Sequence, residues 1–207
     1  RVVDLGGSAH NGTMAMGGIE PAMLRQMTFE SFEPAGRARD RQSRETLEAA
    51  LAMSLSFATD PDGWLVLVGD SGCGKTHLGV AIANEQLRKG ADVFFAFVPD
   101  LLDHLRYTFS PDSRVTYDEL FDRIKQAPLL ILDDLGSESS TAWANEKLYQ
   151  IIVHRHNARL PTIITTRAIP AGSNDPVASR LNDPRLVVVI PITAADFRQA
   201  GSLKGRR

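Results

Sequence analysis

Short apolar runs alternate with amphipathic segments along most of this chain. Between the runs, apolar residues recur at helical spacing, most clearly over 143–157. Continuous apolar strands separated by helices are typical of a parallel sheet that is covered on both faces. The pattern therefore predicts one α/β domain, a three-layer sandwich with a five-stranded parallel sheet. The five runs are rich in β-branched or aromatic residues and lie at 64–68, 93–98, 129–132, 162–165 and 186–190.

The remaining helices are predicted from spacing and from residues that start or stop helices. Ser140 and Thr141 are candidate caps for the helix at 143–157, and Gly90 is placed to end the helix at 76–89. We predict a flexible lead-in or linker remnant at 1–27, the domain at 28–200 and a basic tail at 201–207. The other predicted helices are 41–58, 100–108 and 116–126.

Composition narrows the class of protein. The net charge of −2 provides no overall field that would recruit nucleic acid, so any such contact must be local. A single cysteine, Cys73, excludes a disulfide within the chain and a cysteine-rich zinc site. No apolar run approaches the roughly 18 residues of a membrane span, and no signal peptide is visible. We therefore expect a cytoplasmic protein with no membrane partner.

One glycine-rich segment carries the strongest chemical signal. It matches G-x-x-x-x-G-K-[ST], and it lies between a predicted strand and a predicted helix. In that context backbone N–H groups surround phosphate oxygens, and the helix N-terminus adds partial positive charge. Lys75 is expected to reach the β- and γ-phosphates of ATP, and Thr76 to hold Mg²⁺. The predicted nucleotide-binding residues are Gly69, Asp70, Ser71, Gly72, Cys73, Gly74, Lys75, Thr76 and His77.

Two acidic residues, Asp133 and Asp134, end the apolar run at 129–132. At the carboxyl edge of a parallel sheet they would face the same crevice as the glycine-rich loop. Asp133 suits the Mg²⁺ shell, usually through water. Asp134 suits polarising an attacking water molecule, which predicts an ATPase.

The ordered motifs resemble those of the AAA+ ATPases, and more closely those of the DnaC/DnaI-type bacterial helicase loaders. IstB-type transposition helper ATPases share much of the pattern. The resemblance covers about residues 28–198 and implies a P-loop NTPase fold with an absent or minimal lid domain. It is carried by GDSGCGKTHL at 69–78, LILDDLG at 130–136 with Glu138, WANEKLYQIIVHRHN at 143–157, LPTIITT at 160–166 and SRL at 179–181.

The resemblance also implies catalytic residues beyond the loop. Arg180 matches the arginine that acts on the ATP of a neighbouring subunit, which implies self-association or a partner ATPase. Arg167 stands where many members have a polar residue that senses the γ-phosphate, so either Thr166 substitutes for that residue or Arg167 itself points at the phosphate. Asp134 replaces the usual Glu, so hydrolysis is expected to be slow. An alternative interpretation of Arg180 is a surface ion pair with Asp183 or Asp175.

The long connection at 99–127 resembles the helical element with which initiators and loaders line a DNA channel. Its candidate DNA contacts are Arg106, Tyr107, Phe109 and Arg114. In the alternative interpretation the two aromatic rings fill the core and the arginines are solvated.

Four functions remain open from the sequence. The first is an ATP-driven loader that places a hexameric replicative DNA helicase on single-stranded DNA. The second is a transposition helper acting on duplex DNA. A small-molecule kinase, which would not need Arg180, and a nucleotide-binding adaptor without useful hydrolysis are the others.

Overall fold

The centre of the molecule is a five-stranded sheet in which every neighbouring pair of strands is parallel. The computed structural model describes residues 19–34, 40–139, 141–169 and 175–197. The strand order is β2-β3-β4-β1-β5. The predicted α/β architecture and its five parallel strands are confirmed. The strands are β1 (Trp64–Gly69), β2 (Val93–Phe97), β3 (Leu129–Leu135), β4 (Thr162–Thr166) and β5 (Val187–Ile192).

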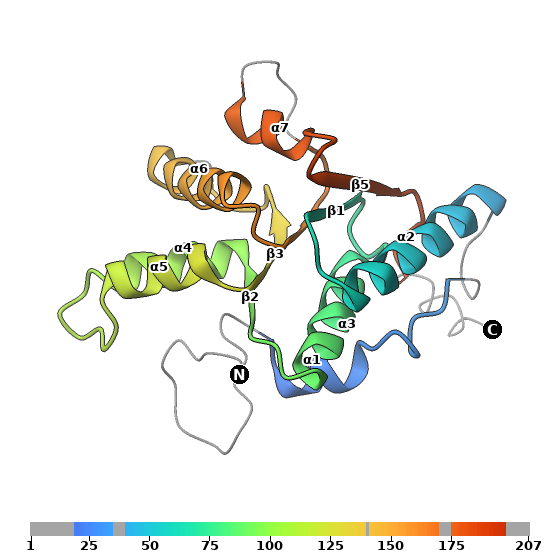
Figure 1. The fold of residues 1–207 in the computed structure, drawn as a ribbon, viewed down its shortest axis with the longest axis horizontal. Helices are drawn as coiled ribbons and strands as arrows, with labels where there is room; N and C mark the ends of the chain where they lie inside the picture. Colours follow the sequence, from blue (N-terminus) through green and yellow to red (C-terminus); the bar gives the residue numbers. More distant parts are fainter. Residues whose placement is uncertain (1–18, 35–39, 140, 170–174, 198–207) are drawn as a thin grey trace, which may run out of the picture.

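Helices cover both faces of the sheet, which gives three layers (Figure 1). One face is covered by α1 (Pro21–Gln26), α2 (Arg41–Thr59) and α3 (Lys75–Arg88). The opposite face is covered by α4 (Val98–Tyr107), α5 (Tyr117–Gln126), α6 (Ala142–Asn157) and α7 (Pro176–Leu181). None of the helices in the described part of the chain is long and apolar enough to cross a membrane.

Strand side chains alternate between two hydrophobic clusters, one on each face. In β1, Trp64 and Val66 pack toward α4–α7, whereas Leu65 and Leu67 pack toward α2 and α3. Successive strand residues point to opposite faces, so a strand covered on both sides must be apolar throughout. This is why β1 to β4 appear in the sequence as apolar runs, whereas the edge strand β5 is buried only at Val187 and Ile192.

Side-chain caps fix where several helices begin. The Thr141 hydroxyl accepts a hydrogen bond from the backbone N–H of Ala144 at 3.1 Å, as predicted, whereas Ser140 lies outside the described residues. Thr116 and Glu119 form a reciprocal capping box at the start of α5. Val98, predicted as the end of a strand, instead begins α4, because Pro99 favours the first turn of a helix.

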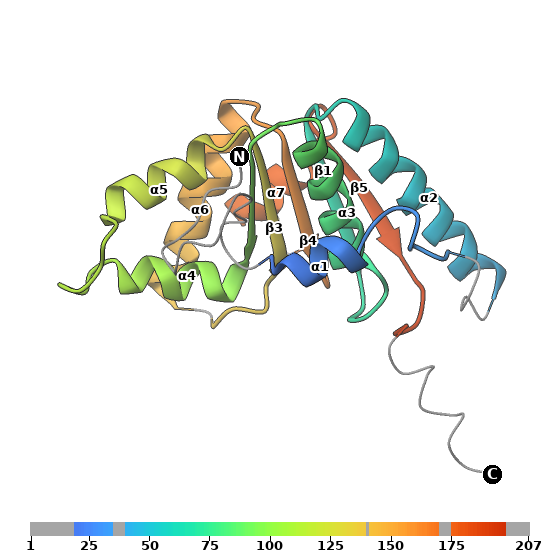
Figure 2. The ribbon, with the colours of Figure 1, turned by 90° about the horizontal axis from the view of Figure 1, so that it is seen from below.

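Residues 19–27, which are part of the predicted lead-in, pack against the domain. Ile19 is buried, and the Asn84 side chain on α3 donates to the backbone carbonyls of Leu24 and Met27. The α1 helix lies beside the lower end of α3 (Figure 2). The remainder of the predicted lead-in and the predicted basic tail at 201–207 lie outside the described residues.

A buried arginine joins three elements on the α4–α7 side. Arg155 of α6 is fully buried, and Nη1 donates to the carbonyls of Lys125 and Ala127 just where α5 ends. Nη2 donates to the Pro161 carbonyl at 2.6 Å, and Nε donates to the Thr162 hydroxyl at 2.9 Å. Burial lowers the pKa of Arg155 to about 9, so the group stays charged at neutral pH. The carbonyl end of α5 offsets that charge.

We predict that Arg155→Met lowers the free energy of unfolding by about 3 kcal/mol, since it orphans several buried carbonyls. For a chain of this size the melting temperature should fall by roughly 6–12 °C, measured by calorimetry. Arg88→Met is the matched control, because Arg88 is 73% exposed and forms a surface ion pair with Glu85. Equal melting temperatures for the two variants would contradict the structural role of Arg155.

Candidate nucleotide-binding site

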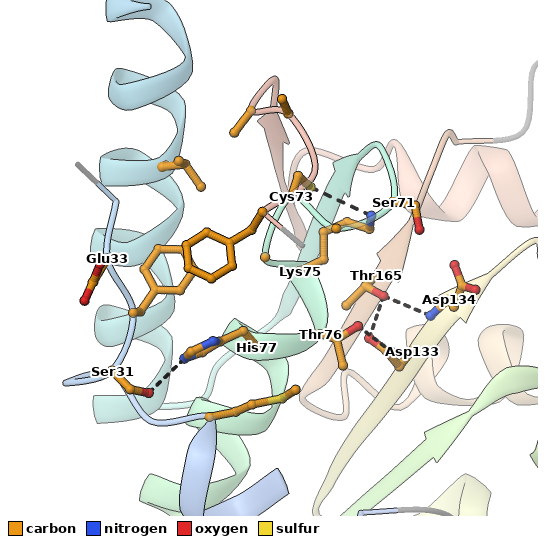
Figure 3. Close-up of a pocket in the computed structure, with 18 of the residues that line it drawn as sticks. Ser31, Glu33, Ser71, Cys73, Lys75, Thr76, His77, Asp133, Asp134 and Thr165 are labelled. Atoms are coloured by element: carbon orange, nitrogen blue, oxygen red, sulfur yellow. Dashed lines mark hydrogen bonds between the residues drawn. The ribbon is translucent and has the colours of Figure 1, made fainter. Parts of the chain in front are cut away.

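A pocket of about 420 Å³ lies at the carboxyl edge of the sheet (Figure 3). The loop between β1 and α3 forms its floor, β3 contributes Asp133 and Asp134, and β4 contributes Thr165. The structure therefore brings the predicted loop and the predicted acidic pair into one site. Of the nine predicted binding residues, 71–77 line the pocket, whereas Gly69 and Asp70 do not.

The loop needs its glycines for the turn and for close approach. Gly72 and Gly74 have φ angles of +79° and +108°, in the left-handed region that favours glycine. A Cβ on Gly74 would lie 2.9 Å from the ring of Phe32, and one on Gly72 would overlap Asp196. Lys75 is 6% exposed, and its Nζ donates to the carbonyls of Gly69 and Asp70 at 2.6 and 2.8 Å.

Two threonine hydroxyls converge on the carboxylate of Asp133. Thr76 Oγ1 donates to Oδ2 and Thr165 Oγ1 donates to Oδ1, both at 2.8 Å (Figure 3). These bonds join α3, β3 and β4 at one buried point, since Asp133 is only 1% exposed. Burial raises the pKa of Asp133 above its ordinary value, while the two hydroxyls oppose that shift.

Asp134 occupies an irregularity in β3. Its φ of +60° is uncommon for a residue with a side chain, although Asp tolerates it better than most. The pairing of β3 with β4 shifts register between Leu132 and Leu135, around this residue. The Asp134 backbone N–H donates to Thr165 Oγ1 at 2.9 Å, and Asp134 lines the pocket.

Thr165, and not Thr166, lines the pocket. Thr166 Oγ1 instead lies 2.8 Å from the carbonyl oxygens of Leu135 and Ala168, and the residue is absent from the pocket lining. Adjacent residues of a strand face opposite ways, so only one of these threonines can reach Asp133. Arg167 is exposed and does not line the pocket either.

The far wall of the pocket lies outside the predicted binding residues. Phe32 and Phe197 line it together with Met27 and Leu47. His77 Nε2 donates to the Thr28 carbonyl at 2.8 Å, and its ring meets the Phe32 ring edge-on with centroids 5.2 Å apart. These contacts hold residues 28–33 against the start of α3. Their only sequence signal is the aromatic pair Phe29 and Phe32.

Cys73 is 3% exposed, and its thiol lies 3.9 Å from Lys75 Nζ. Burial raises the pKa of the thiol, which keeps it protonated and unreactive at neutral pH.

The other predicted site residues lie away from this pocket. Arg180 is on α7, and its Nη1 donates to the Pro176 carbonyl. Neither proposed ion-pair partner is used: Asp175 caps α7, and Asp183 pairs with Arg185. Arg185 lowers the pKa of Asp183 to about 2.

The candidate DNA residues gather at the tip of the α4–α5 hairpin, which projects from the body (Figure 2). Tyr107 and Phe109 are 55% and 64% exposed, so the interpretation that they fill the core is wrong. Phe109 stacks on Tyr117 with centroids 5.1 Å apart. Arg114 is exposed, whereas Arg106 pairs with Asp103 and lies over the Trp143 ring.

Comparison with known proteins identifies the family. The model of the IstB-like ATP-binding proteins matches residues 18–190, so the chain belongs to that family. The chain is 33% identical over 107 residues to the replicative helicase loader DnaI of Bacillus subtilis, covering 51% of this chain and 33% of that protein. It is 27% identical over 159 residues to the replicative helicase loader DnaC of Escherichia coli strain K12, covering 75% and 61%.

A solved structure of the DnaC helicase loader superposes with a TM-score of 0.66 at 24% identity, covering 82% of this chain and 98% of that one. The fold is thus that of the AAA+ P-loop domains, and the chain is an ATP-binding protein. It spans 33% and 61% of the length of the two curated loaders.

We predict that Thr165→Val weakens ATP binding in the presence of Mg²⁺ about tenfold, because it removes a hydroxyl bonded to a charged carboxylate. Thr166→Val is the matched control: it lies next along the same strand, keeps the same shape and should leave the ATP affinity within twofold. Isothermal titration calorimetry of ATP binding to the two variants, with Mg²⁺ present, measures this difference. An equal loss of affinity in both would contradict the assignment of Thr165.

Proposed function

We propose that this chain binds and hydrolyses ATP in order to deliver a hexameric replicative DNA helicase to single-stranded DNA. The similarity to two curated helicase loaders supports the choice of partner. The exposure of Tyr107 and Phe109 at the hairpin tip supports single-stranded rather than duplex DNA as the ligand. Exposed rings can stack on unpaired bases, which a duplex does not offer.

The pocket residues fit Mg²⁺ together with ATP. Thr76 and Asp133 offer hard oxygen ligands, and the carboxylate is buried with no lysine or arginine paired to it among the described residues. When bound, Mg²⁺ would neutralise charge on the β- and γ-phosphates. Lys75 would exchange its two carbonyl partners for phosphate oxygens.

Hydrolysis would use Asp134 to orient the attacking water. Its carboxylate is one methylene shorter than that of glutamate, so water would be held less firmly and turnover would be slow. A partner protein or DNA would then regulate the rate. Arg180 would act in trans on the ATP of a neighbouring subunit or a partner ATPase, where such an arginine is worth about 10³–10⁵ in rate.

The second candidate is a transposition helper that acts on duplex DNA. The chain matches the model of the IstB-like ATP-binding proteins, and its motifs also resemble those of the IstB-type transposition helpers. This match favours the second candidate. The two candidates share the ATP site and differ in the form of DNA that the ATP-bound protein prefers.

We predict that the ATP-bound protein binds single-stranded DNA at least tenfold more tightly than duplex DNA of equal length. Replacing both Tyr107 and Phe109 by Ser should remove most of that preference, because stacking contributes about 1–3 kcal/mol per base. Equilibrium fluorescence anisotropy with ATP, with ADP and without nucleotide measures both effects.

Two controls make that result specific. Lys75→Ala should abolish the ATP dependence, and Leu55→Ser alters an exposed apolar residue on α2, distant from the hairpin, so it should change nothing. A preference for duplex DNA in the ATP state would instead favour the transposition helper.

A further inference from the structure

The α7 helix is fixed firmly on the domain although it is only six residues long. Asp175 Oδ1 accepts hydrogen bonds from the backbone N–H groups of Val177 and Ala178 at 2.8 and 3.1 Å. Ala178 and Leu181 are buried, and Leu181 belongs to the cluster shared with α6. The backbone that carries Arg180 is therefore held in one place.

The Arg180 side chain is held from two sides. Its Nη1 donates to the Pro176 carbonyl at 2.8 Å, and its guanidinium carbon lies 5.7 Å from the centre of the Tyr149 ring on α6. No carboxylate of the described segments forms an ion pair with it. Nε is buried without a hydrogen-bond partner among the described residues, so one of its donors is left for a further acceptor.

Tyr149 is unusual among its neighbours on α6. Leu148 and Ile152 are buried in the core, whereas Tyr149 remains 38% exposed. An exposed ring contributes little to core packing. It can, however, orient a flat cation through its π face without neutralising the charge, which a carboxylate would do.

We propose that Tyr149 is a positioning residue that holds the Arg180 guanidinium ready for an incoming phosphate charge. This inference rests on the proposed role of Arg180 in trans. The ring limits the rotamers of a long side chain, so less freedom is lost when Arg180 meets the neighbour's ATP. The charge stays available because its partner in the resting state is an aromatic ring.

The test compares Tyr149→Phe, Tyr149→Leu and Arg180→Ala by steady-state ATP hydrolysis and by ATP affinity. Arg180→Ala should lower kcat by at least 100-fold. Tyr149→Leu keeps apolar bulk but removes the ring, so kcat should fall about 5–20-fold with the ATP affinity unchanged. Tyr149→Phe keeps the ring and should stay within twofold of the wild-type kcat.

Mixing two variants tests action in trans. Lys75→Ala cannot use its own ATP but keeps Arg180 and Tyr149, so adding it to Tyr149→Leu should restore hydrolysis at the intact sites. Adding Arg180→Ala to Tyr149→Leu should not.

The outcomes separate the two proposals. If Arg180→Ala keeps full turnover, the role of Arg180 in trans is wrong and the role of Tyr149 is overturned with it. If Arg180→Ala loses turnover but Tyr149→Leu does not, only the role of Tyr149 is overturned. If Tyr149→Leu loses ATP affinity, or if its melting temperature falls together with kcat, the role of Tyr149 is structural. That result also overturns the positioning role.

Discussion

The buried carboxylate of Asp133 is the constraint on which the nucleotide site depends. Two hydroxyls, from Thr76 on α3 and Thr165 on β4, converge on it at 2.8 Å. A carboxylate with 1% exposure is costly to keep charged, as its raised pKa indicates. The buried negative charge lowers the free energy of unfolding, but it also forms a binding site for a cation. The rest of the sheet edge, from the P-loop to the bulge at Asp134, is arranged around it.

Strand geometry explains how that point is built. Parallel strands end at one edge, so β1, β3 and β4 deliver their terminal residues to the same place. The left-handed conformation of Asp134 brings its N–H to the same Thr165 hydroxyl that donates to Asp133. Residues 28–33 then close the far wall of the pocket through His77 and Phe32. One cluster thus connects the nucleotide site to the N-terminal segment.

Much of this was predictable from the sequence, for physical reasons. Strands buried on both faces must be apolar throughout, which makes β1 to β4 recognisable in the sequence. The P-loop is recognisable by the spacing of its glycines, lysine and threonine. The choice between Thr165 and Thr166 was not predictable, because every residue of β4 is buried and no polar alternation shows which face each occupies. The contact between His77 and Thr28 joins residues far apart in the sequence, so no local pattern predicts it. The α1 helix has only six residues, which is too short for a helical periodicity to be recognised.

The most direct test of the account compares ATP binding by the wild type and Asp133→Asn, with and without Mg²⁺, alongside their melting temperatures without nucleotide. The folded-state pKa of Asp133 lies above its ordinary value, so above that folded pKa the charged carboxylate destabilises the fold. Asn removes the charge. We predict that Asp133→Asn melts no lower than the wild type but loses the gain in ATP affinity that Mg²⁺ provides. A variant that melts several degrees lower and keeps the Mg²⁺ effect would contradict it.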